Sequence, residues 1–232
     1  MVKNTFIFLL LVATAFIFIH LFAGFSGNQD LNPIAKYYAT NGPAEVGSAN
    51  LVTAVVVTYR GLDTLGEVTI LFLSAAIVGF FLKIENTDNK NRPLKYVSEI
   101  LNTASQILVP IMMLFGIYVF INGHLSPGGG FQGGAIIASS IVLMFIAQPK
   151  KEIGHKLITV IESISGLSFV LLGVAGIFLA SGFLDNSILP LGKFGTLFSA
   201  GIIPVIYIFV GLKVGSELTG IALSLKENQN EA

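Results

Sequence analysis

Long apolar segments dominate this chain, and polar residues gather in short stretches between them. A helix needs roughly 20 apolar residues to cross a bilayer core of about 30 Å. Because lipid offers the backbone no hydrogen-bond partner and no alternating barrel strands are visible, we expect the long segments to be helices. The pattern predicts an all-α, polytopic transmembrane protein of about six spans. The segments are 5–25, 67–82, 105–121, 131–147, 157–179 and 194–218.

A shorter apolar segment near residues 49–59 has a different character. It is rich in valine and ends at Tyr59-Arg60. At that length we expect an interfacial or re-entrant segment, or an extension of the following helix, rather than a seventh span. Length alone leaves six and seven spans open.

Basic residues are concentrated in two connecting segments, and this distribution favours six spans. The positive-inside rule predicts that both basic segments are cytoplasmic. With six spans Lys3 and Lys226 also lie inside, so we expect a multi-pass protein of the cell membrane with both termini cytoplasmic. Segments 123–130 and 181–191 contain neither Lys nor Arg. The basic residues are Lys83, Lys90, Arg92 and Lys95 in one segment, and Lys150, Lys151 and Lys156 in the other.

The polar linker at 85–93, which reads ENTDNKNRP, is the best internal boundary. It divides the chain into a two-span unit at 1–88 and a four-span unit at 89–232. No repeat relates the two units.

The composition of the chain excludes several classes of partner and of catalytic site. The chain has 53% hydrophobic and 11% charged residues, and its 13 Lys and Arg balance 13 Asp and Glu, so we expect no nucleic-acid partner. Cysteine is absent, which excludes iron–sulfur clusters, disulfides and a thiol nucleophile. His20, His124 and His155 lie far apart in the sequence. We therefore predict no metal site, no cofactor and no catalytic centre within this chain.

The first candidate site is the polar string at 60–67, which reads RGLDTLGE and precedes an apolar helix. In a helix, Asp63 and Glu67 share a face with Arg60. Ionisable side chains at a membrane boundary raise the free energy unless they are ion-paired or in contact with water. These three residues could therefore hold a proton or a sodium ion. Equally, the acids could stabilise a helix start while Arg60 anchors at the interface. The spacing fits both interpretations.

The second candidate is a glycine-rich string between two predicted spans. Consecutive glycines after a proline interrupt a helix, so the backbone either turns tightly or lines a water-filled cavity. A compact turn, with close helix contact at the last two glycines, explains most of the string. It does not explain His124, whose proton affinity lies near physiological pH. The motif residues are Pro127, Gly128, Gly129, Gly130, Phe131, Gly133 and Gly134.

The third candidate is Lys213 with Glu217, one helical turn apart inside the last span. A buried lysine without a partner tends to lose its proton, whereas a glutamate at i+4 keeps both groups charged. Such a pair could gate proton movement or stabilise the fold. It could also lie near the membrane interface, with the Lys213 side chain reaching outward to water.

Two of these strings together resemble a known family. The string at 123–134, GHLSPGGGFQGG, resembles the signature of the B subunit of Mrp-type multisubunit sodium/proton antiporters. RGLDTLGE resembles a segment near the C-terminus of the large A subunit. The resemblance extends to energy-converting membrane-bound hydrogenase-type complexes. There an E-like membrane subunit carries the RGxDTLGE string and an F-like membrane subunit carries the PGGGF string. The chain looks like a fusion, with 1–88 E-like and 89–232 B-like or F-like.

The resemblance implies a membrane subunit of a cation/proton antiporter module, with Na⁺ and H⁺ as transported ions and other membrane subunits as partners. Lys213 departs from the antiporter B subunits, which carry an aspartate near this position, and is closer to the F-like subunits. A non-conducting assembly subunit of the same kind of complex is the alternative. The residues expected to take part in ion translocation are Asp63, Glu67, Lys213, Glu217 and His124.

Overall fold

The computed structural model describes residues 2–24, 30–84 and 97–231. It contains two compact units, residues 1–37 and 38–232, which are described separately. The first unit consists of α1 (Val2–Gly24) and the beginning of α2 (Pro33–Val46). Helix α1 is the first predicted span. Helix α2 was not predicted, but its start has a local cause: Ala35 N donates to Asn32 Oδ1 at 2.7 Å, and Pro33 suits the first turn.

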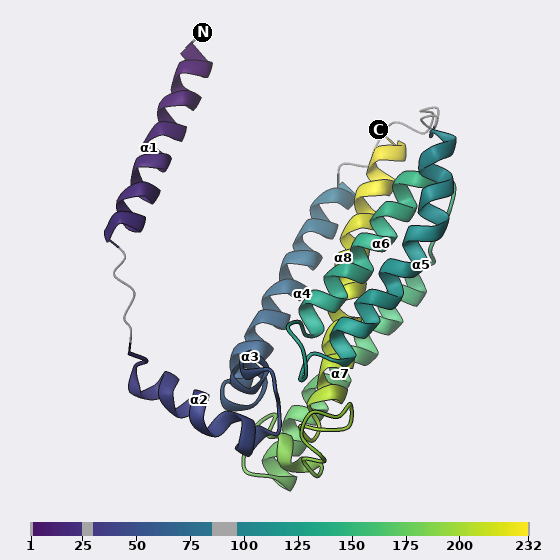
Figure 1. The fold of residues 1–232 in the computed structure, drawn as a ribbon. Helices are drawn as coiled ribbons and strands as arrows, with labels where there is room; N and C mark the ends of the chain where they lie inside the picture. Colours follow the sequence, from purple (N-terminus) through teal and green to yellow (C-terminus); the bar gives the residue numbers. More distant parts are fainter. Residues whose placement is uncertain (1, 25–29, 85–96, 232) are drawn as a thin grey trace. The chain divides into compact units, whose positions relative to one another are not determined.

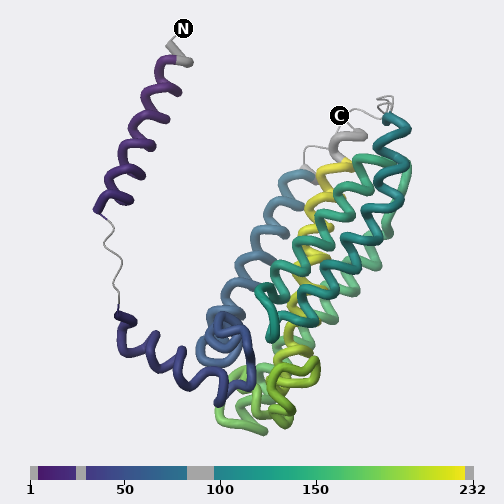
Figure 2. The backbone as a smooth tube through the Cα atoms, in the orientation of Figure 1, coloured from purple at the N-terminus to yellow at the C-terminus, as the bar shows by residue number. Residues whose placement is uncertain are grey.

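The second unit contains five long helices, and they lie side by side (Figure 1). Among them, α8 contacts all four of the others and is the most buried span, so it forms the centre of the bundle. Figure 2 shows the same path, with α4, α6 and α8 running in one direction and α5 and α7 in the other. The helices are α4 (Gly61–Ile84), α5 (Glu99–Ile121), α6 (Gly130–Ala147), α7 (His155–Leu179) and α8 (Ile203–Glu231).

Six helices in the described part of the chain are long and apolar enough to cross a membrane, namely α1 and α4 to α8. The predicted all-α polytopic fold is therefore confirmed. The sixth predicted span began too early, because residues 194–202 form a loop before α8. Gly192, Gly195 and Gly201 have φ values of +66°, +80° and +60°, which break a helix there despite the apolar side chains. Helix α4 also begins at Gly61 rather than at 67.

The short apolar segment forms α3 (Leu51–Thr53) and a π-helical turn, η1 (Ala54–Tyr59), before Arg60 interrupts the helix. Asn50 caps α3, with its Oδ1 accepting from Val52 N and Thr53 N. Ala54 and Val57 are fully buried in the main core. The segment is thus a short helical piece packed on the bundle. The linker 85–93 lies outside the described residues, and the division at 88 stays a prediction.

The two ends of the bundle have different characters. At one end, Lys226 Nζ donates to Lys151 O at 2.5 Å and His155 Nε2 lies 2.5 Å from Glu227 Oε1, so the second basic segment meets the end of α8. The opposite end carries α3, η1, the glycine-rich loop and the loop that precedes α8 (Figure 1). Which end is cytoplasmic stays a prediction from the basic residues.

Candidate ion-translocation site

The glycine-rich loop is held by polar side chains that lie more than seventy residues earlier in the chain. Asn50 Nδ2 donates to Gly123 O at 2.8 Å and to Ser126 O at 2.9 Å. The carbonyl of His124 accepts from Ser48 Oγ at 2.8 Å and from Asn50 N at 3.0 Å. The segment before α3 therefore supplies hydrogen-bond donors to three carbonyls of the loop, those of Gly123, His124 and Ser126.

Helix α8 joins this arrangement through two hydroxyl groups. Tyr207 OH donates to Thr53 Oγ1 at 2.8 Å, and Thr53 Oγ1 donates to Gly123 O at 2.6 Å. We call Ser48, Asn50, Thr53 and Tyr207 the Asn50 network. Sequence reasoning missed all four residues. The one local signal was Asn50 directly before a short helix, which predicts a cap but not a partner in a distant loop.

The glycines of the motif permit close backbone approach. Gly128 and Gly129 have φ values of +145° and +150°, which side chains rarely tolerate. A Cβ atom on Gly133 would lie 2.6 Å from Gly116 O, and one on Gly134 would lie 2.7 Å from Gly211 O. These contacts bring α6 against α5 and α8, so the compact-turn interpretation with close helix packing is confirmed.

The other motif residues differ in their surroundings. Pro127 is exposed, whereas Phe131 is partly buried and packs against the main core. A Cβ atom on Gly130 would meet Val210 at 2.7 Å. Within the described residues this motif thus has a packing role, and any further role in ion movement stays a prediction.

His124 is fully buried beside the loop that precedes α8. Its Nε2 lies 3.3 Å from Thr196 O, and its Nδ1 has no hydrogen-bond partner among the described residues. Burial lowers the pKa of the His124 ring below its ordinary value of 6.5, and the backbone hydrogen bond to Thr196 offsets this only in part. The ring is therefore held neutral near pH 7, and its predicted role as a proton relay stays a prediction.

In the 60–67 string, Arg60 and Asp63 form an ion pair and the Glu67 carboxylate lies outside it. Arg60 Nη2 lies 2.6 Å from Asp63 Oδ2 in an ion pair that is about half exposed. Thr64 Oγ1 donates to Val56 O at 2.6 Å, which satisfies a carbonyl of the π-helical turn. Gly61 lets α4 approach Leu184, since a Cβ atom there would lie 3.0 Å from the Leu184 Cβ. Glu67, one turn beyond Asp63, is exposed and makes no ion pair in the described part of the chain.

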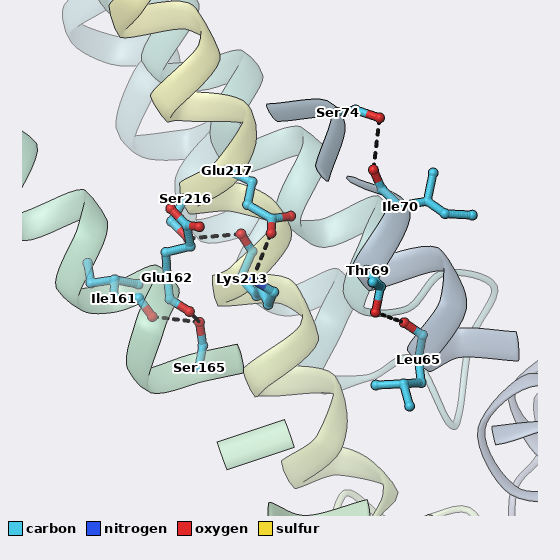
Figure 3. A network of polar contacts seen from close by, with 10 residues as sticks. All are labelled: Leu65, Thr69, Ile70, Ser74, Ile161, Glu162, Ser165, Lys213, Ser216 and Glu217. Atoms are coloured by element: carbon cyan, nitrogen blue, oxygen red, sulfur yellow. Dashed lines mark hydrogen bonds and ion pairs between the residues drawn. The ribbon is translucent and has the colours of Figure 1, made fainter. Parts of the chain in front are cut away.

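Lys213 and Glu217 form the ion pair that the spacing predicted. Lys213 Nζ lies 2.7 Å from Glu217 Oε1, and the side chains are 11% and 0% exposed (Figure 3). The Phe72 ring of α4 covers the ammonium group, with its centroid 4.8 Å from Nζ. No ion pair or hydrogen bond connects this pair to Asp63 or Glu67 within the residues that the structure describes. Asp63 and Glu67 therefore lie on α4, Lys213 and Glu217 lie on α8 against Phe72 of α4, and His124 lies apart from both pairs in the loop between α5 and α6.

Six apolar helices and an ion pair buried in the last of them define a polytopic helical membrane protein with a charged interior. Residues 100–220 match the family described as a domain related to the MnhB subunit of Na⁺/H⁺ antiporter. Residues 7–86 match the family described as the E subunit of MBH. An uncharacterized protein of Methanocaldococcus jannaschii is 32% identical over 202 residues, which cover 76% of each chain. This chain belongs to the family of proteins with the MnhB-related domain.

Other relatives agree with this assignment. The B subunit of the Na⁺/H⁺ antiporter of Bacillus subtilis is 40% identical over 81 residues, which are 35% of this chain and about half, 51%, of that protein. A chain of an archaeal respiratory membrane complex, the membrane-bound sulfane sulfur reductase, is 36% identical with a TM-score of 0.78, covering 97% of this chain and 98% of that one. A chain of the Mrp complex from Dietzia sp. DQ12-45-1b shares the fold, with 24% identity and a TM-score of 0.73 over 93% of this chain and 25% of that one.

These relatives make the chain a multi-pass membrane subunit of a cation antiporter-like complex. The predicted relation to Mrp-type B subunits is confirmed at the level of the family. The match of residues 7–86 agrees with the predicted E-like unit, while the relation to hydrogenase-type complexes stays a prediction. The fusion boundary, the transported ions and the roles of single residues stay predictions.

Proposed function

We propose that this chain is a fused E-like and B-like or F-like subunit of a Na⁺/H⁺ antiporter module, in which helices of several subunits build the ion pathway. A redox-driven complex is favoured over a stand-alone exchanger. This preference rests on the full-length similarity to a chain of an archaeal respiratory membrane complex and on Lys213 in the last span. Proton or redox energy from partner subunits drives the exchange.

The observation that carries the proposal is the buried ion pair at the centre of the bundle. Charged side chains inside a membrane protein cost several kcal/mol each unless they are paired, and even a paired couple often contributes no net stability. Helix α8 nevertheless has Lys213 and Glu217 at positions where apolar side chains would pack equally well. A role in moving ions accounts for that placement better than stability does.

Glu67 provides the second part of the proposal. Its carboxylate is exposed beside apolar side chains of α4 such as Ile70, which is 67% exposed. A carboxylate on such a face needs water or a partner subunit beside it. Asp63 and Glu67 are therefore the first exchangeable carboxylates, on a face shared with another subunit. Lys213 and Glu217 continue the path inside this chain, and His124 relays protons at the end of α5.

The test is Glu67→Gln in the assembled complex, with sodium-dependent proton flux measured in vesicles. We expect flux to fall at least about tenfold, since a positioned proton-transfer group contributes that much or more. The matched control is Glu152→Gln, which removes an exposed carboxylate before α7. Normal assembly with undiminished flux in the Glu67 variant would exclude Glu67 from the pathway.

An assembly subunit without a conducting role is the second candidate. The observation in its favour is the Asn50 network, in which each bridging donor has a partner and which joins the glycine-rich loop to α3 and α8. This alternative requires charge-removing substitutions to lower complex stability and flux together. Loss of flux in a fully assembled Glu67 variant would exclude it.

A further inference from the structure

Three helices meet around the Lys213 side chain. Helix α7 contributes Gly166, and a Cβ atom there would lie 3.1 to 3.2 Å from Cδ, Cε and Nζ of Lys213. Helix α4 contributes the Phe72 ring over the ammonium group. Because Gly166 leaves room for the side chain and the Phe72 ring covers its ammonium group, Lys213 lies beside Glu217 rather than reaching the interface.

Glu217 is not fully satisfied by this pairing. One carboxylate oxygen, Oε1, faces Lys213 Nζ at 2.7 Å. The other, Oε2, is buried and has no hydrogen-bond partner among the described residues. The nearby Ser216 hydroxyl does not fill this place, since Ser216 Oγ donates to Lys213 O at 2.8 Å. A buried acceptor without a donor is costly, so a proton on this oxygen or a donor beside it is expected.

A second carboxylate lies close to the first. Glu162 is four residues before Gly166 on α7, which puts both on one face of the helix. Figure 3 shows its side chain rising from α7 toward α8 near Ser216. Ser216 is the residue directly before Glu217, so Glu162 lies beside this turn of α8; it is partly exposed, whereas Glu217 is fully buried.

The helices around this group carry almost no other charge. Helix α6 has no charged residue, and α5 has only Glu99 at its start. Helix α4 has none between Glu67 and Lys83. One cation, Lys213, and two carboxylates, Glu162 and Glu217, thus lie where α7 packs on α8. With all three groups ionised the net charge is −1, which one bound proton neutralises.

We propose that Glu162 and Glu217 share one exchangeable proton beside Lys213; this deepens the proposed function and rests on it for the link to transport. We call these three residues the Lys213 cluster. The partly exposed Glu162 takes the proton from outside the bundle. The proton then passes to the Glu217 carboxylate, so that one O–H bond breaks at Glu162 and one forms at Glu217, while Lys213 stays protonated. The cluster alternates between net charge 0 and −1.

The test is infrared difference spectroscopy of the assembled complex between acidic and neutral pH. Wild type should show a pH-dependent C=O stretch of a protonated carboxyl group. Glu162→Gln and Glu217→Gln should each abolish that same band. In either variant one carboxylate remains, and Lys213 keeps it ionised. Glu152→Gln is the matched control and should leave the band unchanged. If the band survives in either of these two variants, the proposal that Glu162 and Glu217 share a proton is wrong.

A conservative variant separates charge from structure. Glu162→Asp keeps a carboxylate and should retain the band, shifted in pH, even if packing changes. Loss of the band in Glu162→Asp as well as in Glu162→Gln would overturn the proposal.

Proton flux on the same vesicles distinguishes the two proposals. We expect Glu162→Gln to lower flux at least about tenfold together with loss of the band. Loss of the band with unchanged flux overturns the role of the Lys213 cluster in exchange, while the proposal for Glu67 stands. Loss of flux in Glu67→Gln with the band intact supports both.

Discussion

The Asn50 network and the Lys213 cluster both place polar atoms inside the bundle, but they are completed differently. In the Asn50 network, Asn50 donates to two carbonyls of the glycine-rich loop, and Tyr207 and Thr53 each donate in turn. In the Lys213 cluster, one oxygen of Glu217 lacks a partner among the described residues. A saturated neutral network makes its structure rigid, whereas an incomplete charged one is stable only if a proton or ion completes it.

The largest effect should come from breaking the charged group. Lys213→Met removes the cation and leaves Glu217 buried without compensation, which should destabilise the complex by about 3–5 kcal/mol. The double variant Lys213→Met with Glu217→Leu should regain most of this stability, because apolar residues replace the pair. Thermal unfolding in detergent measures both. If the double variant were as unstable as the single one, the ion pair itself would be required for the stability of the fold.

A smaller loss should follow from breaking the neutral network. Thr53→Val removes the acceptor of Tyr207 OH and should cost about 1–3 kcal/mol, because a buried hydroxyl loses its partner. The matched variant is Tyr207→Phe, and the double variant should cost less than the sum of the two. Denaturant unfolding of the complex measures the three values, and proton flux per assembled complex should be unchanged. A selective loss of flux would place the Asn50 network in the pathway.

The smallest effect should be a pH dependence due to His124. Burial lowers the pKa of the folded-state ring below 6.5, so below that pH the unfolded chain binds more protons than the folded one. The stability contribution of His124 is complete above the unfolded value and is lost as pH falls toward the lowered folded value. Melting temperatures at pH 5 and pH 7.5 should therefore differ less in His124→Asn than in wild type. Exposed His20→Gln is the control, and an unchanged slope in His124→Asn would contradict the expectation.

The comparison also explains which sequence predictions held. Apolar length and i,i+4 spacing are local properties, so they were sufficient for the six spans and for the pairing of Lys213 with Glu217. The start of α8 was wrong because positive-φ glycines override an apolar segment. The exposure of Glu67 could not be predicted, because spacing places a residue on a helix face without saying what covers that face.

By itself the sequence determined the apolar segments, the glycines that allow close helix contact and the charged pair one turn apart, since each depends on neighbours within a few residues. Only the tertiary structure decided that Asn50 holds a loop residue 73 positions away. It also decided that Gly166 and Phe72 lie against Lys213, and that Glu162 of α7 lies beside Ser216 of α8, next to Glu217 (Figure 3). These contacts depend on how α4, α7 and α8 pack, and packing between distant segments leaves no periodic signal in a single sequence.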